Sequence, residues 1–259
     1  MKLRWISVLV MGVAAAAMGQ AAPGGGDTSA PPEAMGVLKT LQDRAGTLKD
    51  FTAKVESDTT HLAGDVDTQT GDAVFVNDAG AGGGAGGGAG SEFKFAAHFT
   101  NATSDGKAAP TPDLEIVFDG TRMTMIDRKA KTYRSSTLTS PGGGAGTGSG
   151  VTSLGGPMPL PIGLDPAAVV KDFQVTMGEA PDGDHVVLKL KPRDKTKFDY
   201  KSLTMTVDKK LQLPVEVDVD QKGGEETAIK LTDVKVNGGG VTIPEVTPPK
   251  EAGWTVEEK

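Results

Sequence analysis

The sequence has 259 residues, a net charge of −7 and no cysteine, and 36 of its residues are glycines. A chain of this length can hold one all-β domain with additions, or two small domains. The negative charge argues against a nucleic-acid partner, because phosphate binding needs clustered basic residues. It also argues against simple electrostatic docking on anionic membranes. The lack of cysteine excludes disulfide bonds and the N-terminal acylation that a bacterial lipoprotein receives on that residue.

The first 22 residues are typical of a secretory signal peptide. Lys2 and Arg4 form a basic start, and the apolar stretch over residues 5–18 is too short for a comfortable transmembrane helix. Small residues at 19–22 offer a cleavage site, and the alternative is an uncleaved membrane anchor. We therefore expect residues 23–32 to form a linker and residues 33–259 to form one domain. Glycine-rich inserts interrupt this domain at 79–90 and 141–150.

The residue pattern beyond the linker predicts a mainly β domain with two helices. A helix is expected over 33–49, opened by Pro31-Pro32, and a short helix over 165–171, opened by Asp165-Pro166. Alternation of apolar and polar residues predicts about eleven strands, joined mostly by short turns. Within 198–236 this alternation changes phase near Thr232-Asp233, which predicts a β-bulge that bends the sheet. A sheet of this kind must pack on another sheet, pack on a helix, or surround a cavity.

Motifs for catalysis or metal binding are absent from the sequence. His61, His98 and His185 have no partner at ligand spacing, and no nucleophile elbow or phosphate-binding glycine loop occurs. Three aspartates in the sequence DVDTQTGD resemble a calcium loop faintly, but the glycine falls one place late and the closing glutamate is missing. A hairpin turn is the preferred interpretation there. We expect neither an enzyme nor a cofactor.

Apolar side chains recur at the inward positions of the predicted strands. They form either a plain core or a pocket for an apolar ligand, for which methionine is well suited because it is unbranched and adaptable. The inward set is Phe51, Val55, Phe93, Phe95, Phe99, Ile116, Phe118, Met123, Met125, Leu203, Met205, Val207, Val215 and Val217. An irregular but apolar connection precedes the second helix and predicts a mobile lid over 151–172. Its apolar residues are Leu154, Met158, Leu160, Ile162 and Leu164.

The ordered series of elements resembles the LolA-like periplasmic lipoprotein carriers. LQDRAGTLKDFTAKVES is similar to the first helix and strand of that family, and VFDGTRMTMIDRKAKTYR is similar to its Asp-Gly hairpin. LTDVKVN followed by IPEVTPPKEAGWTV resembles its closing strand and proline-rich end. The resemblance covers most of residues 33–259 apart from the glycine blocks. It implies an unclosed antiparallel β-barrel that wraps over one long and one short helix.

The resemblance also implies a function. Members of the family bind the acyl chains of lipoproteins on the concave face and move them from the inner to the outer membrane. The expected partners are acylated lipoprotein or lipid cargo, an inner-membrane lipoprotein-releasing ABC transporter and an outer-membrane acceptor, with the chain acting as a periplasmic monomer. The alternative is a regulator that uses the same half-barrel to sense lipid or envelope stress. One feature differs: the region that holds a lid-latching arginine in the carriers holds Asn77-Asp78 here.

Overall fold

A computed structural model describes residues 30–77, 93–137 and 165–258. Two helices lie within these ranges, α1 (Pro32–Thr47) and α2 (Pro166–Asp172). The strands are β1 (Asp50–Thr60), β2 (Val66–Asn77), β3 (Phe93–Ser104), β4 (Lys107–Ala108), β5 (Leu114–Phe118), β6 (Arg122–Asp127), β7 (Thr132–Thr137), β8 (Phe173–Met177), β9 (His185–Pro192), β10 (Tyr200–Asp208), β11 (Leu213–Gln221), β12 (Glu226–Val236) and β13 (Thr255–Glu258). Neither described helix is long and apolar enough to cross a membrane.

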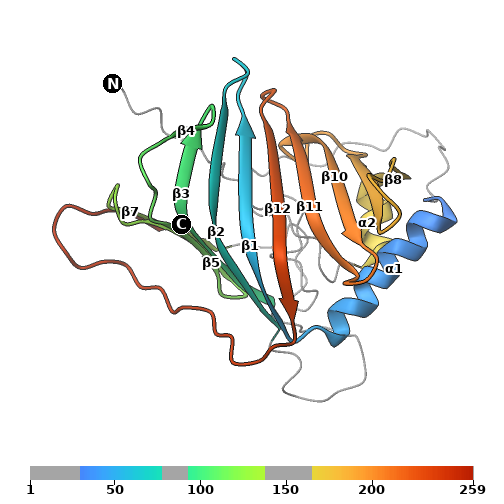
Figure 1. The fold of residues 1–259 in the computed structure, drawn as a ribbon, viewed down its shortest axis with the longest axis horizontal. Helices are drawn as coiled ribbons and strands as arrows, with labels where there is room; N and C mark the ends of the chain where they lie inside the picture. Colours follow the sequence, from blue (N-terminus) through green and yellow to red (C-terminus); the bar gives the residue numbers. More distant parts are fainter. Residues whose placement is uncertain (1–29, 78–92, 138–164, 259) are drawn as a thin grey trace, which may run out of the picture.

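All thirteen described strands belong to one sheet. Its order is β13-β7-β6-β5-β3-β2-β1-β12-β11-β10-β9-β8, with β4 attached to β3 alone. Neighbouring strands are antiparallel except β13, which runs parallel to β7. No pairing in the described chain joins β13 to β8, so the curved sheet stays unclosed, while both helices lie at its β8–β11 end (Figure 1). The predicted class, an unclosed antiparallel β-barrel over two helices, is confirmed.

The count of about eleven strands was too low by two within the described residues. β4 has only two residues, too few to show any alternation. All four residues of β13 are exposed, so no apolar face marks it in the sequence. Backbone pairing with β7 and two surface ion pairs hold β13 instead: Arg122–Glu258 and Arg134–Glu257, each at 3.2 Å.

The predicted bulge in the last long strand is present. The partners of Thr52 and Lys54 on β12 are Lys235 and Thr232, so one extra residue enters β12 between them. Asp233 lies there with a φ of 52°, a left-handed conformation that aspartate tolerates better than most residues. This conformation explains why the apolar positions of β12 change phase at that point.

The main core lies between the concave face of the sheet and the two helices. Ala34, Leu38, Leu41 and Ala45 of α1 are buried in one cluster with side chains from both halves of the sheet. A smaller buried group lies on the opposite face of the strands and outside this cluster. It consists of Ala96, Val117, Ile126 and Tyr133.

Candidate functional site

The concave face brings together most of the residues predicted to bind lipid. Twelve of them are buried and belong to the main cluster, and they come from β1, β3, β5, β6, β10 and β11. Those twelve are Phe51, Val55, Phe93, Phe95, Phe99, Ile116, Phe118, Met123, Leu203, Met205, Val207 and Val217. Met125 is half-buried and packs against the same cluster. Whether these side chains contact a ligand stays a prediction.

Val215 differs from the other predicted residues. The register between β10 and β11 moves from the pair Thr206–Glu216 to the pair Val207–Pro214, so Val215 is the extra residue of a bulge. As a result Pro214 is buried, whereas Val215 is half-buried and lies outside the main cluster. The alternation in the sequence does not show this bulge, because Leu213, Val215 and Val217 alternate regularly and so assign Pro214 to the outward face.

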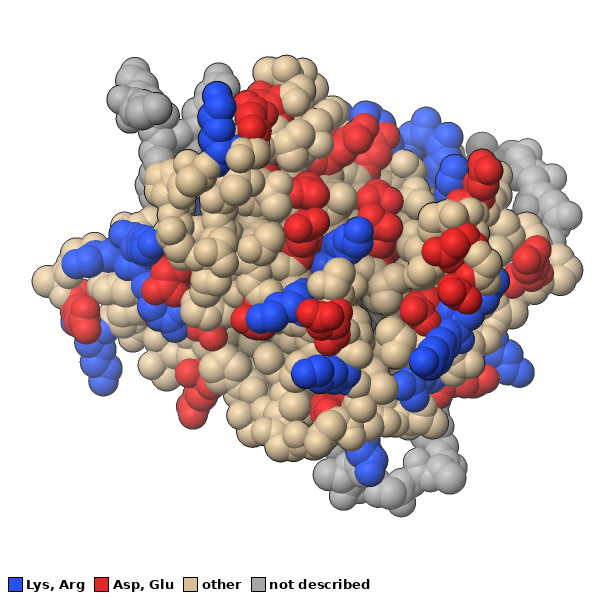
Figure 2. All heavy atoms as spheres, viewed as in Figure 1, with Lys and Arg blue, Asp and Glu red and all other residues tan. Residues whose placement is uncertain are grey.

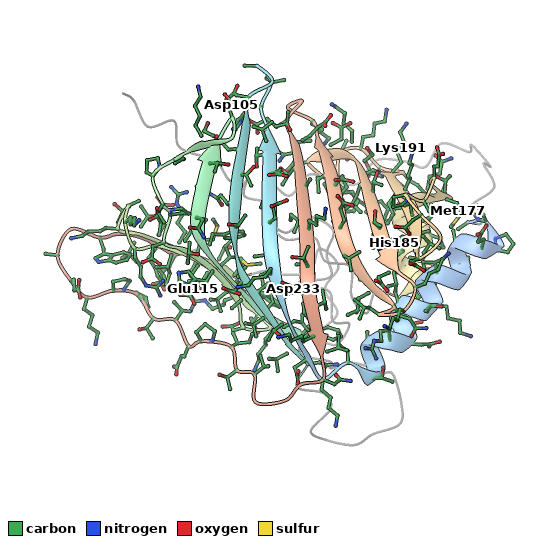
Figure 3. All side chains as sticks on the ribbon, viewed as in Figure 1. Asp105, Glu115, Met177, His185, Lys191 and Asp233 are labelled. Carbon is green, nitrogen blue, oxygen red and sulfur yellow. The ribbon has the colours of Figure 1, made fainter. Side chains whose placement is uncertain are left out.

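The predicted lid residues Leu154, Met158, Leu160, Ile162 and Leu164 lie outside the described residues, as do the signal peptide and both glycine-rich inserts. The described cover of the concave face is therefore α1 with α2. Met177 at the end of β8 and His185 at the start of β9 lie at the same end of the molecule as α1 (Figure 3).

Two asparagines hold the C-terminal end of α1. Asn77 Nδ2 donates to Leu48 O at 2.9 Å and to Ala45 O at 3.1 Å, and Asn77 itself is buried. Asn237 Oδ1 accepts a hydrogen bond from Lys49 N at 2.8 Å. The last carbonyl groups of a helix have no partner within the helix, so the Asn77 amide supplies donors to carbonyls at this end, while Asn237 binds the N–H group just beyond it. Asn77 lies in the region where the resemblance led us to look for a latching arginine.

The other end of α1 borders an open cleft of about 330 Å³. On the helix side its lining is Glu33, Gly36, Val37 and Thr40; on the sheet side it is Val186, Val207, Asp208, Lys209 and Gln212. Val207 lines this cleft and is also one of the predicted lipid-binding residues, so the cleft lies at the margin of the concave face. The lining combines the apolar side chains Val37, Val186 and Val207 with the charged side chains Glu33, Asp208 and Lys209, a combination that suits a ligand with an apolar chain and a polar head.

One cluster of titratable side chains lies at the tips of two hairpins. His61 bridges two hairpin tips, with Nδ1 3.1 Å from Glu225 Oε1 and Nε2 3.0 Å from Asp67 Oδ2. Hydrogen bonds to Glu225 and then to Asp67 raise the pKa of His61 above its ordinary value.

The aspartates of the DVDTQTGD segment lie in and beside the β1–β2 hairpin, as expected. Among the described residues, no group of three or more His, Asp or Glu side chains could hold a metal ion.

Charges of both signs are intermingled on the face of the sheet seen in Figure 2. Lys54 and Asp72, for example, are both more than half exposed and form an ion pair across β1 and β2. Such exposed pairs contribute little to stability. The described geometry thus offers an apolar inner face with a cleft at its margin, and a mixed polar exterior.

The sequence matches no protein-family model and no curated protein. Among solved structures, it is similar to a LolA superfamily protein from Nitrosomonas europaea, with 12% identity, coverage of 79% of this chain and 93% of that one, and a TM-score of 0.34. It is also similar to LprF from Mycobacterium bovis, with 16% identity, coverage of 84% and 98%, and a TM-score of 0.38. The third is the Pseudomonas aeruginosa MucA/MucB complex, with 10% identity, coverage of 81% of this chain and 59% of that one, and a TM-score of 0.42. At such identities the likeness concerns the arrangement of strands and helices, not the residues of a site.

Proposed function

We propose that the chain is a periplasmic, non-enzymatic carrier that binds the acyl chains of lipoproteins, or of related lipids, on its concave face and moves them from the inner to the outer membrane. The observation that carries this proposal is the apolar inner face, which extends from β1 to β11 under two helices and has the cleft beside α1 at its margin. An inner-membrane ABC transporter would load the carrier, and an outer-membrane acceptor would unload it.

The energetics of the cargo make such a carrier necessary. Burial stabilises each CH₂ group by about 0.8 kcal/mol, so a chain with ~15 buried carbons gains roughly 12 kcal/mol on leaving water. Acylated cargo does not cross an aqueous compartment at a useful rate without a carrier protein. A half-barrel with an apolar inner face removes the acyl chain from water once α1 moves away from the sheet.

The proposal is tested by measuring lipid bound to the protein. Mass spectrometry of the protein purified from a periplasmic extract should detect acylated species, and a fluorescent fatty acid should bind to the delipidated protein. Recovery of no lipid together with no uptake of the probe would refute it. Binding without transfer of the probe between vesicles would favour the sensing alternative.

Two adjacent residues on β6 provide a matched pair for the same assay. Met125 faces the concave cluster and is half-buried, whereas Ile126 is buried on the opposite face. Met125→Ala should weaken probe binding, because it removes apolar contact area from the inner face. Ile126→Ala should lower stability without changing the affinity of the folded protein. Equal affinities for the two variants would place the probe elsewhere.

A further inference from the structure

An aromatic group closes one end of the concave face near α2. Phe173 at the start of β8, Phe198 in the turn before β10 and Tyr200 at the start of β10 pack against one another. Ring centroids lie 4.8 Å apart for Phe173–Phe198, 5.4 Å for Phe198–Tyr200 and 6.4 Å for Phe173–Tyr200. A register shift between Tyr200 and Ser202 turns Tyr200 inward, against the alternation of the strand, and only 5% of Tyr200 is exposed.

Within residues 30–77, 93–137 and 165–258, the buried hydroxyl group of Tyr200 has no hydrogen-bond partner. A buried tyrosine hydroxyl normally finds a partner, because an unpaired polar group in an apolar setting is destabilising. Its two aromatic neighbours are phenylalanines, and a third phenylalanine would fill the same volume without this penalty. The hydroxyl is therefore a candidate hydrogen-bond donor to a bound molecule.

The charge environment defines what kind of group the hydroxyl can bind. Burial, and then the negative charge of Asp172, raise the pKa of Tyr200, so the phenol is a neutral hydrogen-bond donor at physiological pH. Lys197 Nζ lies 3.4 Å from Asp172 Oδ1 and offsets part of that negative charge. The remaining negative charge disfavours an anionic acceptor such as a free carboxylate. A neutral carbonyl oxygen fits better.

We propose that the Tyr200 hydroxyl donates a hydrogen bond to the carbonyl oxygen of the ester or amide that links an acyl chain to its cargo. The inference rests on the proposed function and specifies its ligand chemistry. From Tyr200 the inward residues Leu203, Met205 and Val207 continue along β10 toward the cleft, over roughly 23 Å at about 3.3 Å per residue. An extended acyl chain anchored at Tyr200 would lie along this row. Phe198, which is only partly buried, would turn aside to admit it.

The test compares two lipids with the same chains, a diacylglycerol ester and its dialkyl ether analogue, which lacks the carbonyl oxygens. Tyr200→Phe should weaken ester binding by about fivefold, the typical effect of one hydrogen bond, and leave ether binding unchanged. Tyr133, the other tyrosine of the chain, lies buried on the opposite face and gives the matched control. Tyr133→Phe should change neither affinity.

Stability of the ligand-free variant provides the second measurement. Because the hydroxyl has no partner in the described structure, Tyr200→Phe should leave the urea midpoint of the delipidated protein unchanged or raise it. A lowered midpoint would show that the hydroxyl is already hydrogen-bonded without ligand and would overturn the inference. Unchanged ester affinity in Tyr200→Phe would overturn it as well, with lipid binding itself intact. A wild-type protein that binds neither lipid would instead remove the proposed function, and this inference with it.

Discussion

Gly71→Ala offers the sharpest test of the described sheet. Gly71 lies in β2, where the register with β3 shifts between Thr70 and Gly71. A Cβ atom at Gly71 would lie 1.9 Å from His98 O, 2.7 Å from His98 C and 2.9 Å from Phe99 Cα. Every obstacle is backbone, so no side-chain rotation relieves the overlap. The two strands would have to move apart, which would break the hydrogen bonds between them.

Over-packing of a well-packed interior usually costs 1–3 kcal/mol where side chains can adjust. Here the backbone must move, so we expect Gly71→Ala to lower the free energy of unfolding by about 3 kcal/mol or more. β3 also carries Phe95 and Phe99 of the concave face, so binding of an acyl probe should weaken in parallel. Urea denaturation measures the first effect, with the m-value as a check for two-state unfolding.

Gly36 in α1 is the matched control. Apart from its chain neighbours and the backbone of its own helix, no described atom lies within 4 Å of a Cβ atom at Gly36, and helix interiors favour alanine over glycine. Gly36→Ala should therefore stabilise the protein by about 0.5–1 kcal/mol. If Gly71→Ala stayed within ~1 kcal/mol of the wild type, the close approach of β2 and β3 would be wrong.

Three further predictions concern stability. The raised pKa of His61 stabilises the folded state below its ordinary pKa and loses this effect as pH rises through the folded pKa, so the wild type should exceed His61→Ala in stability by more at pH 5.5 than at pH 8.5. An equal difference at both pH values would argue against the bridge to Asp67 and Glu225. Asn77→Ala should lower stability by about 1–3 kcal/mol and speed amide exchange at the end of α1, because two helix carbonyls lose their donor. Met205 is fully enclosed, so Met205→Ala should cost about 2–5 kcal/mol in the delipidated protein; a loss below ~1 kcal/mol would contradict its enclosure in the described core.

Alternation was a reliable guide wherever a strand is regular. On β10 it placed Leu203, Met205 and Val207 on one face, and all three are buried in the main cluster. It failed where a bulge changes the count of residues. Val215 lies in such a bulge on β11, and Tyr200 is turned inward by another. The phase change on β12 was recognised because Leu231 and Val234 fall on opposite phases, whereas Leu213, Val215 and Val217 keep one phase across the β11 bulge and charged residues flank Tyr200.

The sequence does not predict which residues far apart in the chain contact each other. Nothing near Asn77 indicates that its side chain meets the end of α1, 29 residues earlier. The bond between Lys49 N and Asn237 Oδ1 joins positions 188 residues apart. Asparagine is also common in turns, so its presence after a strand carries no hint of helix capping. The resemblance directed attention to this region for an arginine, and only the structure shows that asparagine holds the helix there.

The pairing of β1 with β12 has a consequence for how the chain reaches this fold. The first long strand finds its second neighbour only after some 170 further residues have been made, since Asp58 pairs with Ala228. Pairings of such high sequence separation slow folding and leave an apolar strand edge open in the meantime. The C-terminal end of α1 receives Asn237 from just beyond β12, so this second contact forms only once β12 has paired with β1, whereas Asn77 is available from β2 beforehand. A chain that stops before β12 would therefore present β1 as an open edge beside a helix that lacks one of its two asparagine contacts, which is a form prone to association with other copies.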